Sequence, residues 1–282
     1  SLIAATPGMI AFIPESMVEE GAQLNFIEDN SISPKEVFAG SEWFPTATPA
    51  PLFGMWPLLA GTLWVSFFAI LFALPFGISI AVYMAEVAPE RVRNILKPVI
   101  ELMAALPSVV IGFIGMVIVA PWLQETFNLP TGLNLFNAGL MLAFMCIPTI
   151  ASISEDALRN VPGALREASL ALGATRWETL CRVELRWAMG GIGTSVMLGL
   201  SRAIGETMVV LMVAGGAGII PESIFDPVRP MTAGIAAEMA EAAVGGEHYH
   251  ALYAAGLLLF LITFAFNLAA WYFTRRLSLR SA

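Results

Sequence analysis

The chain has 282 residues, of which 57% are hydrophobic and only 13% charged, and its formal net charge is −8. A soluble domain of this size needs about twice that charged fraction, so the composition excludes a soluble enzyme and indicates an integral membrane protein. The two cysteines, Cys146 and Cys181, lie in well-separated segments, so we interpret them as small side chains rather than a disulfide.

The first 56 residues consist of a short apolar stretch and a polar segment. Residues 1–14 are interrupted by Pro7 and are too short for a complete span, and they lack the basic segment and cleavage site of a signal peptide. We expect the outer end of a first transmembrane helix whose beginning is missing. Residues 15–56 carry acids, Trp43 and several prolines, so we expect an extracytoplasmic loop at the membrane interface.

Five later apolar runs are long enough to cross about 30 Å of hydrocarbon. They are residues 57–84, 98–120, 133–153, 187–214 and 250–273. With the incomplete first helix, they predict an all-α integral membrane protein with six transmembrane helices. Residues 57–282 would form one transmembrane domain, in which neighbouring helices or water satisfy the carbonyl groups that internal prolines leave free.

Basic residues divide unequally between the loops. If every run crosses once, one side receives Arg91, Arg93, Lys97, Arg159, Arg166, Arg176, Arg182, Arg186, Arg275, Arg276 and Arg280. The other side receives only Lys35 and Arg229, together with many acids. The positive-inside rule therefore assigns the first side to the cytoplasm.

Arg202 is the one basic residue inside an apolar run. Its insertion costs about 2.5–3.5 kcal/mol, so it is expected to face a partner or a water-filled path. Glu206 follows one helical turn later, where the two would form an ion pair. The pair is either structural or is broken by an arriving anion, and we favour the second because apolar residues would replace a purely structural pair at lower cost.

A guanidinium group suits a tetrahedral oxyanion such as phosphate. It can donate two parallel hydrogen bonds and does not lose its proton. Because Glu206 would cancel most of the field of Arg202, we expect a second basic residue from another chain to complete the pathway.

The run 98–120 supplies two further candidates for the substrate pathway. Glu101 is either a pathway carboxylate or, given the nearby Lys97, a surface acid that extends to the inner interface; the second interpretation is favoured. Ser108 follows Pro107, so it either offers its hydroxyl and free backbone groups to a substrate or serves helix packing as a small residue.

Residues 161–186 form an amphipathic, arginine-bearing segment between two apolar runs. Pro162 suits the first turn of a helix and Gly173 a left-handed helix end, which predicts a helix between them. Thr175 and Glu178 have the spacing of a capping box and predict a second short helix. By pattern alone, such a segment is also typical of an interfacial helix with no further function.

Within this segment, Glu167-Ala168-Ser169 followed by Gly173, Val183 and Leu185 resembles the EAA loop of ABC importer permeases, with Arg186 where that family usually has proline. The resemblance implies that Glu167, Ala168, Ser169 and Gly173 belong to coupling helices that dock on an ATP-hydrolysing subunit. Three other segments, residues 38–46, 106–113 and 201–207, resemble the PstC-type permeases of phosphate-specific ABC importers.

The resemblance implies a type I ABC importer permease (MetI-like) fold in the bacterial cytoplasmic (inner) membrane, which carries inorganic phosphate inward by alternating access. It also implies three partners: a second permease of PstA type, a cytoplasmic ATPase dimer of PstB type and an extracytoplasmic phosphate-binding protein of PstS type. A molybdate or sulfate permease would share the EAA loop and remains an alternative. An ion-gradient-driven secondary transporter is less favoured, because the sequence shows neither paired carboxylates nor inverted halves.

Catalytic and metal-binding signals are weak in this sequence. It contains no P-loop motif and no combination of nucleophile, base and orienting group, so we expect a non-catalytic subunit without cofactor, metal or nucleic-acid partner. His248 and His250 flank Tyr249, and we favour a hydrated interfacial aromatic belt over a metal site there.

Overall fold

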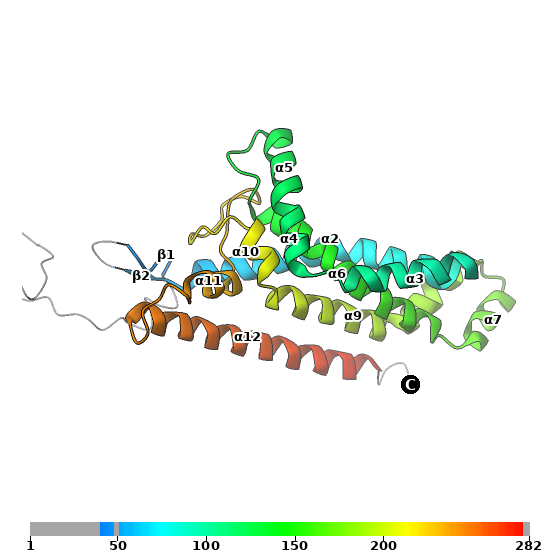
Figure 1. Cartoon of the computed structure of the whole chain (residues 1–282). Helices are drawn as coiled ribbons and strands as arrows, with labels where there is room; N and C mark the ends of the chain where they lie inside the picture. The colour runs from blue at the N-terminus through cyan, green and yellow to red at the C-terminus, as the bar shows by residue number, and fades with distance from the viewer. Residues whose placement is uncertain (1–39, 48–50, 279–282) are drawn as a thin grey trace, which may run out of the picture.

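The computed structural model describes residues 40–47 and 51–278, and most of this part of the chain is helical (Figure 1). The predicted first helix, residues 1–14, and most of the predicted outer loop lie outside the described residues. Four described helices have the length and apolar composition of a membrane span: Trp56–Val87, Ser108–Phe127, Leu135–Arg159 and Glu247–Tyr272. The fold is therefore an all-α membrane fold, as expected.

The centre of the core is the packing of α2 (Trp56–Val82) against α6 (Leu135–Arg159). On α2, small residues recur every four positions at Ala69, Ala73, Gly77 and Ala81 and form one face of the helix. A Cβ at Gly77 would lie 2.7 Å from Cγ2 of Ile150 on α6. Small side chains thus let the two helices approach closely, which is how membrane helices gain packing without a hydrophobic driving force.

The predicted span 98–120 is wrong in its boundaries. Helix α3 (Glu90–Ala104) ends before Pro107, and a new helix begins at Ser108 and runs through α4 (Ser108–Ile114), the π-helical turn η3 (Gly115–Val119) and α5 (Ala120–Phe127). Pro107 has no N–H to donate and forces the preceding residue out of helical conformation, so the apolar run is divided there. In Figure 1 the α4–α5 helix rises steeply from the layer that contains α2 and α6.

The predicted run 187–214 is also interrupted. Helix α9 (Leu185–Gly205) ends at Gly205, Glu206 is extended with ψ 132°, and α10 (Met208–Val213) begins two residues later. Hydropathy detects apolar length but not this change of direction, which no proline marks. Helix α10 packs against α4 and α6. The two interrupted apolar runs, 98–120 and 187–214, therefore meet in the core.

The outer end of the structure holds a short hairpin and two helices. Strands β1 (Trp43–Phe44) and β2 (Leu52–Phe53) pair antiparallel, with Trp43 opposite Phe53. Trp43 is fully buried against α11 (Met231–Glu238) and α12 (Glu247–Ser278), in a cluster with Leu58, Met231 and Leu252. This part of the predicted interfacial loop is therefore packed into the protein.

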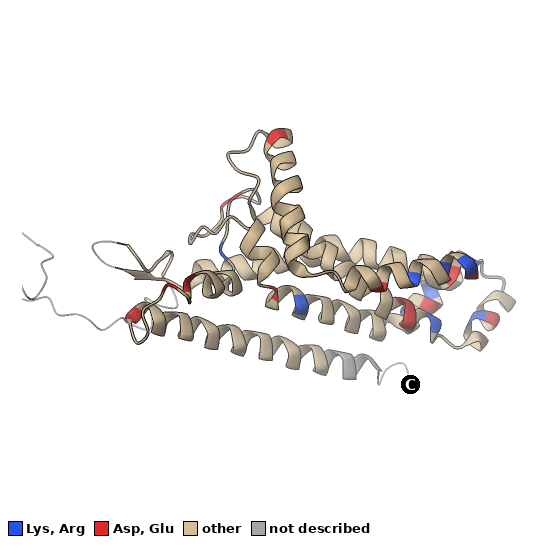
Figure 2. Ribbon diagram, in the orientation of Figure 1, with Lys and Arg blue, Asp and Glu red and all other residues tan. Residues whose placement is uncertain are grey.

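The opposite end carries two short helices, α7 (Gly163–Ala171) and α8 (Arg176–Thr179), and the π-helical turn η4 (Leu180–Glu184) that leads into α9. A further π-helical turn, η2 (Tyr83–Val87), ends the first described span beside them. Figure 2 shows most Lys and Arg residues gathered at this end. The two sides inferred from the charges thus correspond to the two ends of the molecule.

Candidate functional site

Arg202 lies in the last turn of α9, half-buried, and reaches two other helices. Its Nη1 donates to Oγ1 of Thr149 on α6 at 3.4 Å, and its Nη2 donates to the carbonyl oxygen of Ala104 at the end of α3 at 3.5 Å. Both hydrogen bonds are long, so they hold the guanidinium weakly. The group is placed where α3, α6 and α9 meet, with donor capacity left for a ligand.

The expected ion pair between Arg202 and Glu206 is wrong for the described residues: none of their ion pairs joins the two. The pair required one continuous helix, but α9 ends between the two residues. Oε1 of Glu206 instead accepts from the backbone N–H groups of Met208 at 3.2 Å and Val209 at 3.4 Å. Glu206, the residue before the N-cap Thr207, thus accepts from the first N–H groups of α10, where a carboxylate favours the helix dipole.

The backbone of the α9–α10 break is stabilised from α11. Thr232 Oγ1 donates to the carbonyl oxygen of Glu206 at 2.7 Å. Since that carbonyl has lost its helical partner, the hydroxyl satisfies a group that would otherwise be costly inside a membrane. The break between α9 and α10 is therefore stabilised by a specific tertiary hydrogen bond.

Glu101 and Ser108 stand on either side of the α3–α4 break. Glu101 is exposed on α3, in agreement with a surface acid, and Lys97 pairs with other carboxylates. Ser108 is half-buried as the first residue of α4, four residues after the carbonyl that Arg202 contacts. The structure brings Arg202 close to the Ser108 segment, while no hydrogen bond or ion pair of the described residues joins Arg202 to Glu101.

Sequence reasoning missed Thr149 and the carbonyl of Ala104. The signal for Thr149 was a hydroxyl directly after Pro148 within an apolar run, a position at which proline frees backbone groups. Nothing in the sequence indicated the carbonyl, because its availability depends on where α3 ends.

A cavity of about 460 Å³ adjoins the α9–α10 break on the side of α12. Three threonines, Thr207, Thr232 and Thr263, line it together with apolar residues such as Leu259 and Phe260. Arg202 does not belong to its lining, so this cavity and the arginine site are separate features.

The cytoplasmic helix-turn-helix has the predicted form. Helix α7 is followed by Gly173 with φ +86°, a left-handed conformation that favours glycine. Helix α8 begins with the predicted capping box: Thr175 Oγ1 accepts from the N–H of Glu178 at 3.2 Å, and Oε2 of Glu178 accepts from the N–H of Thr175 at 2.9 Å. The backbone N–H of Thr175, and after it the Thr175 hydroxyl, donate to the Glu178 carboxylate and hold the pKa of Glu178 below its usual value.

The four residues of the EAA resemblance lie on the outer surface or at the turn of this loop. Glu167 and Ala168 are exposed, and Ser169 Oγ lies 2.9 Å from Oγ1 of Thr179, joining α7 to α8. Two large apolar side chains are exposed beside them, Leu172 at 90% and Trp177 at 69%. Exposed apolar groups at a water-facing end of a membrane protein are typical of a protein-binding surface.

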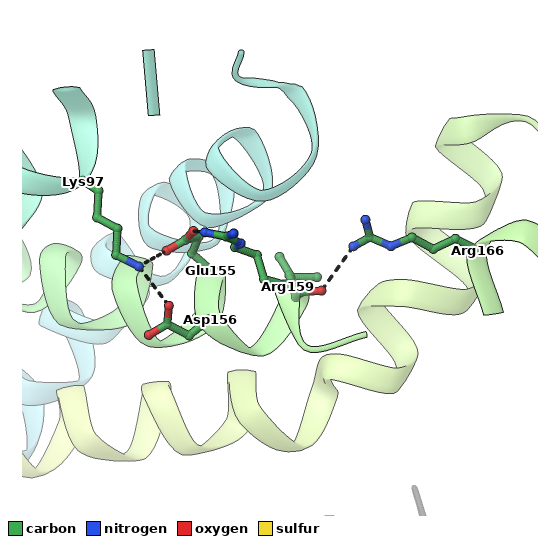
Figure 3. Close-up of polar contacts among 6 residues, drawn as sticks. Lys97, Glu155, Asp156, Arg159 and Arg166 are labelled. Carbon is green, nitrogen blue, oxygen red and sulfur yellow. Dashed lines mark hydrogen bonds and ion pairs between the residues drawn. The ribbon is translucent and has the colours of Figure 1, made fainter. Parts of the chain in front are cut away.

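An ion-pair network connects α3 to the inner end of α6 (Figure 3). Lys97 Nζ lies 2.8 Å from Oε2 of Glu155 and 3.0 Å from Oδ1 of Asp156, and Arg159 Nη1 lies 3.5 Å from Oε1 of Glu155. The Glu155 side chain is fully buried. The hydrogen bond that Lys97 donates to the Glu155 carboxylate is the main cause that raises the pKa of Lys97.

At the outer end, the expectation of hydrated histidines is wrong for His248. Its Nε2 lies 2.9 Å from Oε2 of Glu238, and the same carboxylate accepts from Nε1 of Trp43 and pairs with Arg229. Within residues 40–47 and 51–278, no group of three or more His, Cys, Asp and Glu residues has the arrangement of a metal site.

The four described spans and the helix-turn-helix of α7 and α8 together define a multi-pass membrane protein. Residues 73–279 match the family described as the binding-protein-dependent transport system inner membrane component. Because the match covers most of the sequence, the chain belongs to this family.

Its relatives include a probable ABC transporter permease, YqgH of Bacillus subtilis, which is 38% identical over 88% of this chain and 80% of its own length. A phosphate transport system permease, PstC of Pasteurella multocida, is 39% identical over 73% of this chain and 69% of its own. These relatives are transport components.

Solved structures support the fold. A chain of the MetNI methionine ABC transporter in an inward-facing conformation matches with a TM-score of 0.58 and 21% identity, over 79% of this chain and 94% of that chain. A chain of a bacterial ABC transporter for alginate import matches with a TM-score of 0.59 and 16% identity, over 79% of both chains. The type I importer fold is thus confirmed.

Proposed function

We propose that this chain is a permease subunit of an ATP-driven importer that carries inorganic phosphate across the bacterial cytoplasmic membrane by alternating access. Similarity to several PstC proteins named as phosphate transport system permeases, at 37–39% identity over most of the chain, carries the proposal. The site at Arg202 supports it, since a guanidinium inside a membrane domain suits an oxyanion.

The structure changes how the pathway would work. Arg202 is not neutralised by Glu206, so its positive charge is available to an anion. An arriving phosphate would replace the long hydrogen bonds to the neutral oxygens of Thr149 and Ala104 with shorter ones to its own charged oxygens, so that donor and acceptor are both ionised. Ser108, at the start of α4, lies on the segment nearest to this contact and can donate its hydroxyl; we assign Glu101 a lesser role because it is exposed on α3.

Movement would come from the cytoplasmic end. Glu167, Ala168, Ser169 and Gly173 would form the surface that docks on a PstB-type ATPase, with exposed Leu172 and Trp177 adding apolar contact. A PstA-type permease would supply the second basic residue, and a PstS-type binding protein would deliver phosphate from outside. This chain itself would catalyse no reaction.

Labelled uptake into vesicles that contain the complete complex tests the substrate. Unlabelled phosphate in excess should abolish uptake of labelled phosphate, whereas sulfate and molybdate should leave it nearly unchanged. Equal competition by sulfate or molybdate would contradict the assignment to phosphate. Vesicles carrying Arg202→Ala serve as the reference for uptake without the arginine site.

A further inference from the structure

The polar contacts between helix α7 and the ends of the spans are made by one inward-directed side chain among the described residues, Arg166. The helix buries none of its residues, and the Ser169 hydroxyl forms its hydrogen bond with Thr179 of the neighbouring α8 in the same loop. Arg166 is different: its Nη2 pairs with Glu86 of η2 and donates to the carbonyl oxygen of Leu158 on α6 at 3.2 Å. Figure 3 shows the side chain directed from α7 toward the end of α6.

The same guanidinium has a second acidic partner. Its Nε lies 3.1 Å from Oε1 of Glu184, in the turn that leads into α9. Arg166 therefore contacts the ends of α2 and α6 and the start of α9, next to the small core of Ala81, Leu158, Val161 and Ala188. Arg166 thus connects α7 to the ends of three other helices.

The charges at this joint do not balance. Two carboxylates share one guanidinium, and the side chains are only 4% exposed for Glu184 and 20% for Glu86. Oε2 of Glu184 is buried and accepts no hydrogen bond from the described residues. Among the elements packed around Glu184, η2 contributes the charge of Glu86 and α7 contributes the charge of Arg166, and both change the pKa of Glu184. Arg159 of α6 pairs with Glu155 instead.

We propose that Glu86, Arg166 and Glu184 form a proton-binding joint that sets how firmly α7 is held against the membrane domain. This rests on the proposed function, in which α7 is a coupling helix. With a proton on Glu184, its O–H donates to the Glu86 carboxylate, and Arg166 balances the one remaining charge. When the proton leaves to water, two carboxylates repel each other and the joint loosens.

Electrostatics support the geometry. Burial is the main cause that raises the pKa of Glu184, the charge of Glu86 raises it further and Arg166 opposes both, giving a value of about 7. The proton would thus be gained and lost near neutral pH. The neutral, tightly held form dominates below this value and the charged form above it.

Infrared titration of the full-length protein, in the complex with which it purifies and in lipid nanodiscs, tests the protonation. A carboxyl band should disappear with a midpoint near neutral pH and be absent in Glu184→Gln. Glu86→Gln should lower the midpoint and Arg166→Gln should raise it. Glu90→Gln, which removes an exposed carboxylate of α3, should leave it unchanged. A carboxyl band that persists in Glu184→Gln would overturn the proposal. An unchanged titration midpoint in Glu86→Gln would overturn it as well.

The consequence for coupling is measured as ATP hydrolysed per phosphate transported. In the wild type this ratio should rise several-fold from about pH 6 to about pH 8, because ATP hydrolysis that moves a loosely held α7 would less often be followed by transport. Glutamine imitates the protonated acid, so Glu184→Gln should keep the low ratio at both pH values. An identical pH profile in wild type and Glu184→Gln would refute the coupling role. A complex that shows the titration but transports no phosphate would support the joint and contradict the proposed substrate.

Discussion

The guanidinium of Arg202 lies 3.5 Å from the carbonyl oxygen of Ala104, which is 98 residues away in the sequence. In an uninterrupted helix that carbonyl would accept from the N–H of Ser108. Pro107 ends α3 before this hydrogen bond can form, and Arg202 contacts the oxygen instead. A helix break on one segment thus positions the charge of another.

Arg202→Lys should reduce phosphate uptake at least about tenfold, because an ammonium cannot make the two parallel hydrogen bonds of a guanidinium. Arg202→Ala should abolish uptake while the complex still assembles. Uptake of labelled phosphate, with assembly followed by co-purification, measures both. Arg159→Lys is a matched control, since that arginine is half-exposed at the inner end and should tolerate the change. Undiminished uptake in Arg202→Ala would remove this residue from the pathway.

Glu167→Lys should weaken binding of the ATPase subunit. Glu167 is exposed on α7, so the substitution changes the proposed docking surface without disturbing the core. We expect affinity to fall about tenfold, or ~1.4 kcal/mol. Co-purification at increasing salt measures the effect. Glu90→Lys makes the same charge change on α3 and should retain the ATPase; equal loss in both variants would argue against docking on α7.

Lys97→Met should destabilise the protein by about 1–3 kcal/mol, because it leaves the buried Glu155 carboxylate with only a long contact to Arg159. The pH dependence follows from the raised pKa of Lys97. Its stabilisation is complete below the ordinary value of 10.5 and is lost as pH rises through the higher pKa of the folded state.

Thermal denaturation in detergent checks both statements. The wild-type midpoint should fall at alkaline pH beyond that value, and the fall should be smaller in Lys97→Met. Lys97→Met combined with Glu155→Gln should recover part of the loss, since the buried charge is gone. A double variant no more stable than the single one would show that the Lys97–Glu155 pair is not the cause.

Trp43→Phe should cost about 1 kcal/mol. The ring remains against Phe53, but Glu238 loses the N–H donor at 2.9 Å and keeps Arg229 and His248. Glu238→Gln should cost more, since it removes the charge that Arg229 faces. A double-mutant cycle read by thermal denaturation should give a coupling energy clearly above zero; strict additivity would mean that the hydrogen bond contributes nothing.

Much of the fold could be predicted from the sequence because membrane spans and helix ends have local causes. Apolar length predicted α2, α6 and α12, and the pattern of Thr175, Glu178 and Gly173 predicted the turn between α7 and α8, whose capping hydrogen bonds join residues three positions apart. The division at Pro107 was also local, but hydropathy averages over it. The rule that helices end before proline would have placed it.

The site was harder to predict because its contacts depend on tertiary structure. The Arg202–Glu206 pair assumed a helix that ends one residue too early for it. The joint of Glu86, Arg166 and Glu184 draws on three elements far apart in sequence, and nothing in the local pattern of any one of them marks it. Arg202 itself was identified, since a lone cation in an apolar run is unusual wherever it points.

Helix α7, which buries no side chain, separates two kinds of evolutionary constraint. If α7 is the proposed docking surface, its outward positions can diverge with a changing partner subunit without a cost in folding free energy, whereas a change at Arg166 would remove the contacts to Glu86 and Glu184. One membrane domain can therefore adapt to a different partner subunit by substitutions on the surface of α7 alone. In hybrids between related importers, the sequence of α7 rather than that of the spans should decide whether the complex assembles.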